Sequence, residues 1–236
     1  MSKTFDGFTA VDGADLRVQA GEIVGIIGPN GAGKSTFFNC LAGNLAPTAG
    51  SVMFNGVDVT RASPEAHARL GMARTHQGPL TFEDMTILDN VMVGAFLRHK
   101  RRADASEAAM EVLRFTGLSD ASHLRAGTLG TPGRKRLEIA RALATQPRLL
   151  LLDEALAGLT TAEIQHALEL VREIHQRDVT LVIVEHLMEV IFALARRVIV
   201  FNHGAIIAAG TAEEIVNDPR VVQAYLGTGA AYRRPL

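Results

Sequence analysis

The chain has 236 residues, of which 47% are hydrophobic, and a formal net charge of −1 at pH 7. This composition excludes a disordered chain, and the near-neutral charge argues against a general nucleic-acid surface. Cys40 is the single cysteine, so no internal disulfide can form, and without a secretory segment the chain is expected to be cytosolic. No apolar run approaches the roughly 18 residues that a transmembrane helix needs, so we expect membrane contact only through partners.

The first third of the chain alternates between strand and helix signals. Residues 22–27 (EIVGII) form a short apolar run rich in β-branched residues, which predicts a buried parallel strand. Three further signals follow, namely a helix over 34–42, a strand over 51–54 before an Asn-Gly turn, and a helix opened by Ser63-Pro64-Glu65.

The rest of the chain begins with helical periodicity and then returns to alternation. The expected elements are helices over 86–98 and 105–116, a strand over 149–152, a helix over 161–177, a strand over 180–184, and a hairpin of 198–201 with 205–208.

This order predicts an α/β fold with a mostly parallel sheet, flanking helices and a small antiparallel β part. We expect an α/β core from 1–77 and 146–227. The nearly all-helical stretch 78–145 is expected to be a helical subdomain inserted in that core, and 228–236 a frayed tail.

A glycine-rich loop lies between the first predicted parallel strand and the helix after it. Gly28 to Ser35 (GPNGAGKS) fits G-x-x-x-x-G-K-[ST], whose backbone amides and helix dipole cradle phosphate oxygens. Lys34 is expected to reach the β- and γ-phosphates of ATP, Ser35 to ligate Mg²⁺, and Thr36 to bind the α-phosphate. The expected nucleotide-binding residues are Gly28, Asn30, Gly31, Ala32, Gly33, Lys34, Ser35 and Thr36. The alternative is a glycine-rich turn with a solvated lysine.

Two carboxylates follow the apolar run LLLL. Asp153 and Glu154 stand where a buried strand ends, at the edge where α/β sheets bind ligands. Asp153 is expected to hold the Mg²⁺ shell and Glu154 to polarise the attacking water. Alone, such a pair is usually a surface turn; the P-loop upstream favours the catalytic interpretation.

Together these motifs resemble the ATP-binding subunit of ABC transporters over nearly the whole chain. ARTHQG is similar to the segment that carries the family's glutamine, here Gln77, and MTILDNVMVG to the start of its helical subdomain. RLEIARALATQPRLLLLDE resembles the signature helix with the Walker B strand, AGL at 157–159 the D-loop, and VEHLMEV the segment of the switch histidine, here His186.

The resemblance implies roles for these residues. Two cassettes would face each other head to tail, with ATP between the P-loop of one and the signature of the other. Gln77 would touch Mg²⁺ and the water, and His186 would contact the γ-phosphate and help to align Glu154. Phe5 resembles the aromatic residue that stacks on adenine, with Phe8 and Val11 as weaker candidates; a small core anchor is the alternative for Phe5.

The signature departs from the family pattern Leu-Ser-Gly-Gly-Gln. Leu129–Gly133 reads LGTPG, so the serine hydroxyl is missing at Gly130 and Pro132 lacks an N–H. The basic run Arg134-Lys135-Arg136 could compensate, but we expect a solvated basic turn. Ala155 and Thr160 also differ from the residues usual in the family. This weak signature predicts a heteromeric pair of cassettes.

The expected function is therefore ATP hydrolysis that powers an importer, at the inner face of the cell membrane. MARTHQ and DPRVVQAYLG are similar to subunits of branched-chain amino-acid importers. The expected partners are permease subunits and a second ATP-binding subunit; no nucleic acid is expected. The resemblance places the permease groove near Leu80 and Phe82, with simple core packing as the alternative for either side chain. The alternatives are a regulatory subunit that binds ATP without hydrolysing it and a soluble ABC-type ATPase not tied to transport.

Overall fold

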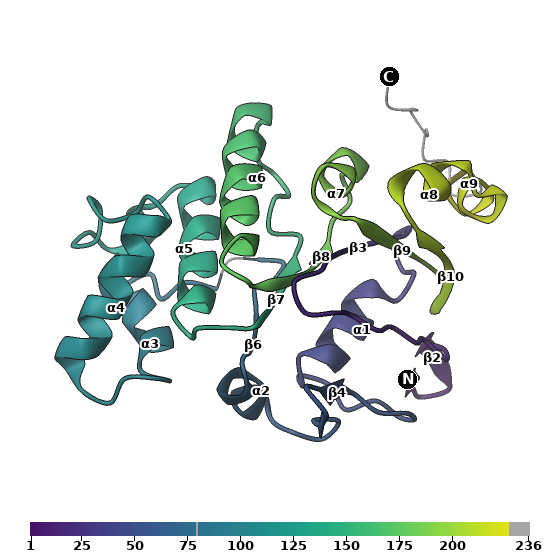
Figure 1. Ribbon diagram of the computed structural model, residues 1–236, viewed down its shortest axis with the longest axis horizontal. Coiled ribbons are helices and arrows are strands. Elements are labelled where there is room, and N and C mark those ends of the chain that lie inside the picture. The colour runs from purple at the N-terminus through teal and green to yellow at the C-terminus, as the bar shows by residue number, and fades with distance from the viewer. Residues whose placement is uncertain (79, 227–236) are drawn as a thin grey trace. The chain divides into compact units, whose positions relative to one another are not determined.

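The computed structural model describes residues 1–78 and 80–226 (Figure 1). The chain divides into two compact units, which we call unit 1 (Met1–His67 with Thr180–Leu236) and unit 2 (Ala68–Val179). The expected tail 228–236 lies outside the described residues. The limits predicted for an inserted helical part, 78–145, stay a prediction.

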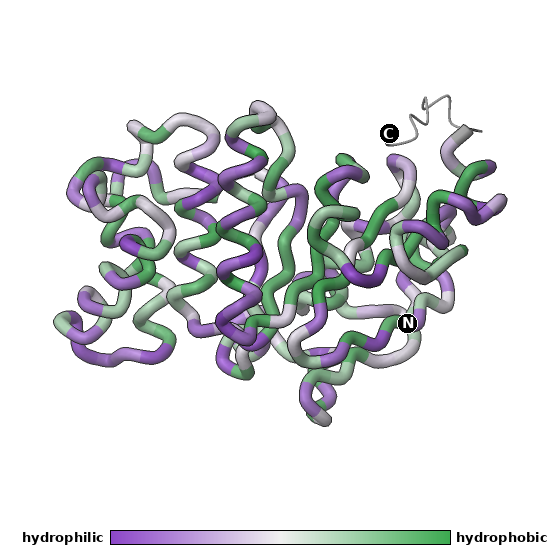
Figure 2. The backbone as a smooth tube through the Cα atoms, turned by 45° about the horizontal axis from the view of Figure 1, so that its top comes forward, coloured by the Kyte–Doolittle hydropathy of each residue, from purple (hydrophilic) through white to green (hydrophobic). Residues whose placement is uncertain are grey.

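Unit 1 is built on strands that read as continuous apolar runs. Their order is β10-β9-β3-β8, with bounds β3 Ile23–Ile27, β8 Thr180–Val184, β9 Arg197–Asn202 and β10 Ala205–Gly210. β3 pairs in parallel with both β8 and β9, whereas β10 pairs antiparallel with β9. All residues of β3 and β8 are buried, as expected of parallel strands covered on both faces. In Figure 2 the tube is mostly green, and hence hydrophobic, along these central strands.

Short hairpins and helices complete unit 1. The hairpins are β1 Lys3–Phe5 with β2 Phe8–Val11, and β4 Met53–Phe54 with β5 Val57–Asp58. The helices are α1 Lys34–Leu41, α7 Met188–Leu194, α8 Ala212–Asn217 and α9 Pro219–Leu226, while α2 Pro64–Leu70 begins in unit 1 and ends in unit 2.

Unit 2 combines a parallel strand pair with helices. β6 Met72–Arg74 pairs with β7 Leu149–Asp153, and the helices are α3 Ile87–Ala95, α4 Arg102–Phe115, α5 Thr131–Leu143 and α6 Thr161–His175, with the 3-10 turn η1 Ala126–Thr128. α3, α4 and α5 pack around a core that includes Val91, Leu113 and Leu137. Among the described residues, no helix is both long and apolar enough to cross a membrane.

Most elements expected from sequence are present with small shifts at their ends. The hairpin expected around His203-Gly204 is β9–β10, with both turn residues at positive φ. The sequence reading missed β1, β2 and β6, which have only three or four residues each, and the helices α7, α8 and α9.

Candidate functional site

The glycine-rich loop of unit 1 joins the end of β3 to the start of α1. The Lys34 side chain turns back into this loop, and its ammonium donates to the carbonyl oxygens of Gly28 (2.6 Å) and Pro29 (3.0 Å). Lys34 is only 5% exposed. An ammonium buried in this loop is well placed to bind an anionic ligand there.

Two glycines are required by the close approach of other backbone to the loop. A Cβ at Gly28 would lie 2.2 Å from the Phe201 carbonyl oxygen, and a Cβ at Gly33 would lie 2.2 Å from that of Ala10. Both also have positive φ, 152° and 99° respectively. The loop thus packs between β2 and the end of β9, and these close contacts fix the curvature of the loop.

We predict that Gly33→Ala destabilises the protein much more than Gly31→Ala. Both positions have positive φ, but a Cβ at Gly31 meets nothing within 4 Å. The difference reports mainly the clash with the Ala10 carbonyl oxygen at Gly33, for which about 1–3 kcal/mol of additional destabilisation is expected. Urea unfolding of the two variants measures it; equal free energies of unfolding would contradict this account of the loop.

The remaining loop residues are arranged for anion binding. Gly33 is the N-cap of α1 and Ser35 and Thr36 lie in its first turn, where main-chain N–H groups have no partner within the helix. Asn30, Gly31 and Ser35 are exposed, whereas Ala32 is buried. Glycine cradle, buried ammonium and helix N-terminus together fit a phosphate chain.

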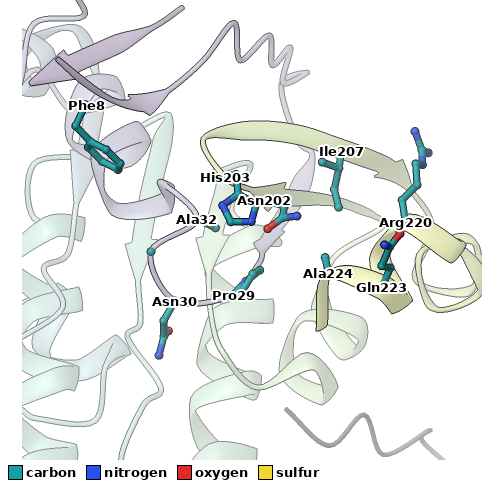
Figure 3. A pocket seen from close by; sticks show the side chains of 11 residues that line it. Phe8, Pro29, Asn30, Ala32, Asn202, His203, Ile207, Arg220, Gln223 and Ala224 are labelled. Carbon is teal, nitrogen blue, oxygen red and sulfur yellow. The ribbon is translucent and has the colours of Figure 1, made fainter. Parts of the chain in front are cut away.

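A cavity of about 810 Å³ adjoins the loop. Figure 3 shows Pro29 and Ala32 of the loop near Asn202 and His203, with residues of α9 on the other side. Phe8, which is 67% exposed, belongs to the lining.

Of the three candidates for stacking on adenine, Val11 is fully buried. Phe5 is 40% exposed at the end of β1, and the Lys3 ammonium lies 4.9 Å from its ring centroid. Both phenylalanines therefore remain able to stack on a base, and Phe5 stays the prediction.

The acidic end of β7 lies in unit 2. Asp153 is 4% exposed and its Oδ2 accepts from Arg74 Nη2 at 3.1 Å. Burial lowers the pKa of Arg74 below its ordinary value, although the negative charges of Asp153 and Glu138 act to raise it. The Arg74 guanidinium thus holds the Asp153 side chain at the strand end, in the position expected from sequence.

Glu154 and Gln77, which are far apart in sequence, meet in unit 2. Gln77 Nε2 donates to Glu154 Oε2 at 2.7 Å. Glu154 is 6% exposed and has a φ of 49°. Its carbonyl oxygen accepts from Lys135 Nζ at 2.9 Å. The structure therefore brings together two of the three residues expected to act in hydrolysis.

Comparison with known proteins matches this geometry over most of the chain. The model of the ABC transporter family matches residues 11–157. The chain belongs to the ABC transporter family. A second model, branched-chain amino acid ATP-binding cassette transporter, matches residues 205–231.

Curated relatives and solved structures cover this cassette almost completely. Two curated relatives are high-affinity branched-chain amino acid transport ATP-binding proteins, each 36% identical to the cassette. The match to BraF of Pseudomonas aeruginosa covers 96% of the cassette and 95% of BraF. The match to LivG of Escherichia coli covers 94% of the cassette and 94% of LivG. A crystal structure of a nucleotide-free ATP-binding cassette from an ABC transporter has a TM-score of 0.87 at 31% identity, covering 95% of each chain. The ADP conformation of an ATP-binding cassette has a TM-score of 0.86 at 31% identity, covering 96% of each. The cassette is thus an ATP-binding ATPase of ABC transport.

The divergent signature precedes and opens α5. Gly130 is the N-cap without a side-chain cap, and Pro132 lies in the first turn. Arg134 stabilises this segment through three hydrogen bonds. Its guanidinium donates to the carbonyl oxygens of Leu129 (2.9 Å) and Gly127 (3.1 Å) and to Oε1 of Glu83 (2.6 Å).

The expectation of a solvated basic turn at Arg134-Lys135-Arg136 is wrong for Lys135. This side chain is 8% exposed and reaches the Glu154 carbonyl. The third residue expected to act in hydrolysis, His186, is exposed in the segment between β8 and α7 of unit 1. Its role stays a prediction.

Sequence reasoning did not single out Glu138 of the cassette. Its Oε1 accepts from the His76 main-chain N–H at 2.7 Å. Burial raises the pKa of Glu138 to about 7, although hydrogen bonds from His76 and Leu80 and the charges of Arg141 and Lys135 lower it. The sequence pattern that could have identified Glu138 is the spacing of Lys135, Glu138 and Arg141, three residues apart in the helix.

We predict that Glu138 makes the cassette less stable as the pH rises. Between pH 4.5 and 7 the unfolded chain releases this proton while the folded protein retains it. The free energy of unfolding therefore falls over this window, on the order of 1–3 kcal/mol from this group. Urea unfolding at pH 5 and pH 8 should show that fall in wild type but not in Glu138→Gln. The same fall in both proteins would contradict the raised pKa; Glu107→Gln on α4 is the exposed control.

Proposed function

We propose that this cassette powers the import of branched-chain or related amino acids, at the inner face of the cell membrane, where ATP is available. The observation that best supports this solute class is the match of residues 205–231 to the branched-chain transporter model. These residues include β10, α8 and α9, outside the segment matched by the general family model. The names of BraF and LivG support the same solute class.

In the proposed mechanism the loop from Gly28 to Thr36 holds the triphosphate of ATP. Lys34 exchanges its two carbonyl partners for oxygens of the β- and γ-phosphates, and Thr36 donates to the α-phosphate. Phe5 stacks on the adenine.

Mg²⁺ would neutralise phosphate charge when bound, with Ser35, Asp153 and Gln77 as its protein contacts. Their oxygen atoms are of the kind that Mg²⁺ prefers. Among the described residues there is no cluster of three or more His, Cys, Asp or Glu that could hold a metal ion alone.

Glu154 is proposed to accept a hydrogen bond from the attacking water and to orient it. The Gln77 amide, 2.7 Å from Glu154 Oε2, holds that carboxylate in place before the water arrives. His186 donates toward the γ-phosphate. Because phosphoryl transfer depends mainly on positioning and charge stabilisation, these residues supply what one cassette must contribute.

We further propose that the cassette works in a heteromeric pair with a second ATP-binding subunit. Gly130 offers no hydroxyl and Pro132 no N–H, so its signature presents fewer donors to the nucleotide of a partner. A partner with a complete signature would leave one strong ATP site, on the P-loop of this chain.

The pairing is tested by measuring ATPase turnover of this chain alone and with each candidate partner cassette and permease. We expect turnover to rise at least about tenfold with the correct partner, since the missing donors each contribute roughly 1.5–3 kcal/mol. Equal turnover by the isolated chain and the assembled complex would overturn the heteromeric pair.

The solute class is tested by uptake of labelled leucine, isoleucine and valine in cells that lack the gene. We expect uptake to fall and to return with the wild-type gene but not with Glu154→Gln. Proline uptake is the control. Unchanged leucine uptake, or loss of a different solute alone, would overturn the assignment.

A further inference from the structure

Helix α5 of unit 2 carries three ionisable side chains on one face. Lys135, Glu138 and Arg141 are three residues apart, a spacing that stacks side chains along a helix. Lys135 and Glu138 are 8% and 6% exposed. Burying charges is costly unless they are paired or hydrogen-bonded, so their contacts indicate what they hold.

The three side chains reach two different segments of the same unit. Lys135 Nζ donates to the carbonyl oxygen of Glu154, and Glu138 Oε1 accepts from the N–H of His76. Arg141 donates to the carbonyl oxygen of Leu80, and its guanidinium carbon lies 4.7 Å from the centroid of the Phe82 ring. Glu138 and Arg141 thus bind the main chain on both sides of Gln77, at His76 and at Leu80.

Glu154 needs such support because its backbone is strained. A non-glycine residue at a φ of 49° lies in the left-handed region, which costs about 1–3 kcal/mol unless the surroundings impose it. The Lys135 ammonium at 2.9 Å and the Ala157 N–H at 3.2 Å both donate to its carbonyl oxygen. This pair of donors fixes the peptide plane from which the Glu154 side chain projects.

We propose that Lys135 and Glu138 are positioning residues that hold Glu154 and Gln77 in contact for hydrolysis. Lys135 fixes the backbone of Glu154, and Glu138 fixes the residue next to Gln77. Both act from one rigid helix, so the 2.7 Å contact between Gln77 and Glu154 is set by α5. The proposal rests on the proposed role of Glu154 in polarising water.

The first test compares Lys135→Met with Lys135→Arg in the assembled ATPase. We expect Lys135→Met to lower kcat about 10- to 100-fold, because loss of alignment alone has effects of this size. KM for ATP and the Kd of a fluorescent ATP analogue should change less than about twofold, since neither residue contacts the P-loop in this account. Lys135→Arg can donate to the same carbonyl and should restore kcat to within about threefold of wild type.

The second test uses Glu138, in case Lys135→Met does not fold. Glu138→Ala removes the acceptor for the His76 N–H and should lower kcat with the Kd for ATP unchanged. Glu138→Gln keeps an oxygen acceptor and should retain more activity than Glu138→Ala. Glu107→Ala, the same change at an exposed residue of α4, is the matched control and should leave kcat unchanged.

The outcomes separate this proposal from the role of Glu154. If Glu154→Gln keeps full turnover, the role of Glu154 is wrong. If Glu154→Gln is inactive while both Lys135→Met and Glu138→Ala keep wild-type kcat, only the positioning proposal is overturned. Failure of Lys135→Arg to restore kcat, or a parallel loss of ATP binding, would also overturn it.

Discussion

Glu154→Gln is expected to lower kcat for ATP hydrolysis about 10²- to 10⁴-fold, the range for loss of a residue that assists proton transfer. The amide occupies nearly the same volume and can still bond with Gln77, so the fold and the ATP site should persist. Steady-state phosphate release by the complex measures kcat, and a fluorescent ATP analogue measures Kd, which should change less than about threefold.

The matched control for this variant is Glu169→Gln, the same chemical change on the exposed side of α6. It should leave both kcat and Kd at their wild-type values. Turnover within about twofold of wild type in Glu154→Gln would contradict the role given to this carboxylate, because loss of a catalytic group lowers kcat by far more than twofold.

Lys34→Ala is expected to raise the Kd for ATP by at least about 100-fold, since charge-assisted hydrogen bonds to phosphate contribute roughly 1.5–3 kcal/mol each. In the structure the Lys34 ammonium is held by the carbonyl oxygens of Gly28 and Pro29 inside the loop. Its removal takes away the positive charge that we propose binds the β- and γ-phosphates. Titration calorimetry with Mg-ATP measures the change.

Lys100→Ala controls for the loss of one positive charge, because Lys100 is exposed between α3 and α4. It should bind ATP like wild type. Thermal unfolding of Lys34→Ala separates lost binding from lost folding. Wild-type affinity in a folded Lys34→Ala protein would contradict the phosphate site at this loop.

Local sequence was enough to predict the parts that depend on short-range patterns. The run EIVGII and the glycine loop predicted β3 and the turn before α1, because buried strands and P-loops each have a strong local signature. The same holds for the β9–β10 hairpin, whose turn residues His203 and Gly204 both have positive φ. β1 and β2 were missed because three or four residues carry too little periodicity.

Thr160 is a departure from the family pattern that the structure explains locally. It is the N-cap of α6 and forms a capping box with Glu163, whose carboxylate accepts from the Thr160 N–H at 2.7 Å. Threonine satisfies this role as aspartate would.

The contacts of α5 could not be predicted, because they depend on pairing with distant segments. Lys135 and Glu138 are polar residues in a basic helix start, where solvation is the usual expectation. Their burial follows only once Glu154, 19 residues on, and His76, 62 residues back, are placed beside the helix.

A crystal structure of the Glu154→Gln cassette with its partner and Mg-ATP would show directly where the triphosphate binds. We expect the triphosphate along the main-chain amides of residues 31–36, with Lys34 Nζ within about 3 Å of β- and γ-phosphate oxygens. A loop without nucleotide, or a triphosphate held by a different segment of the chain, would contradict it.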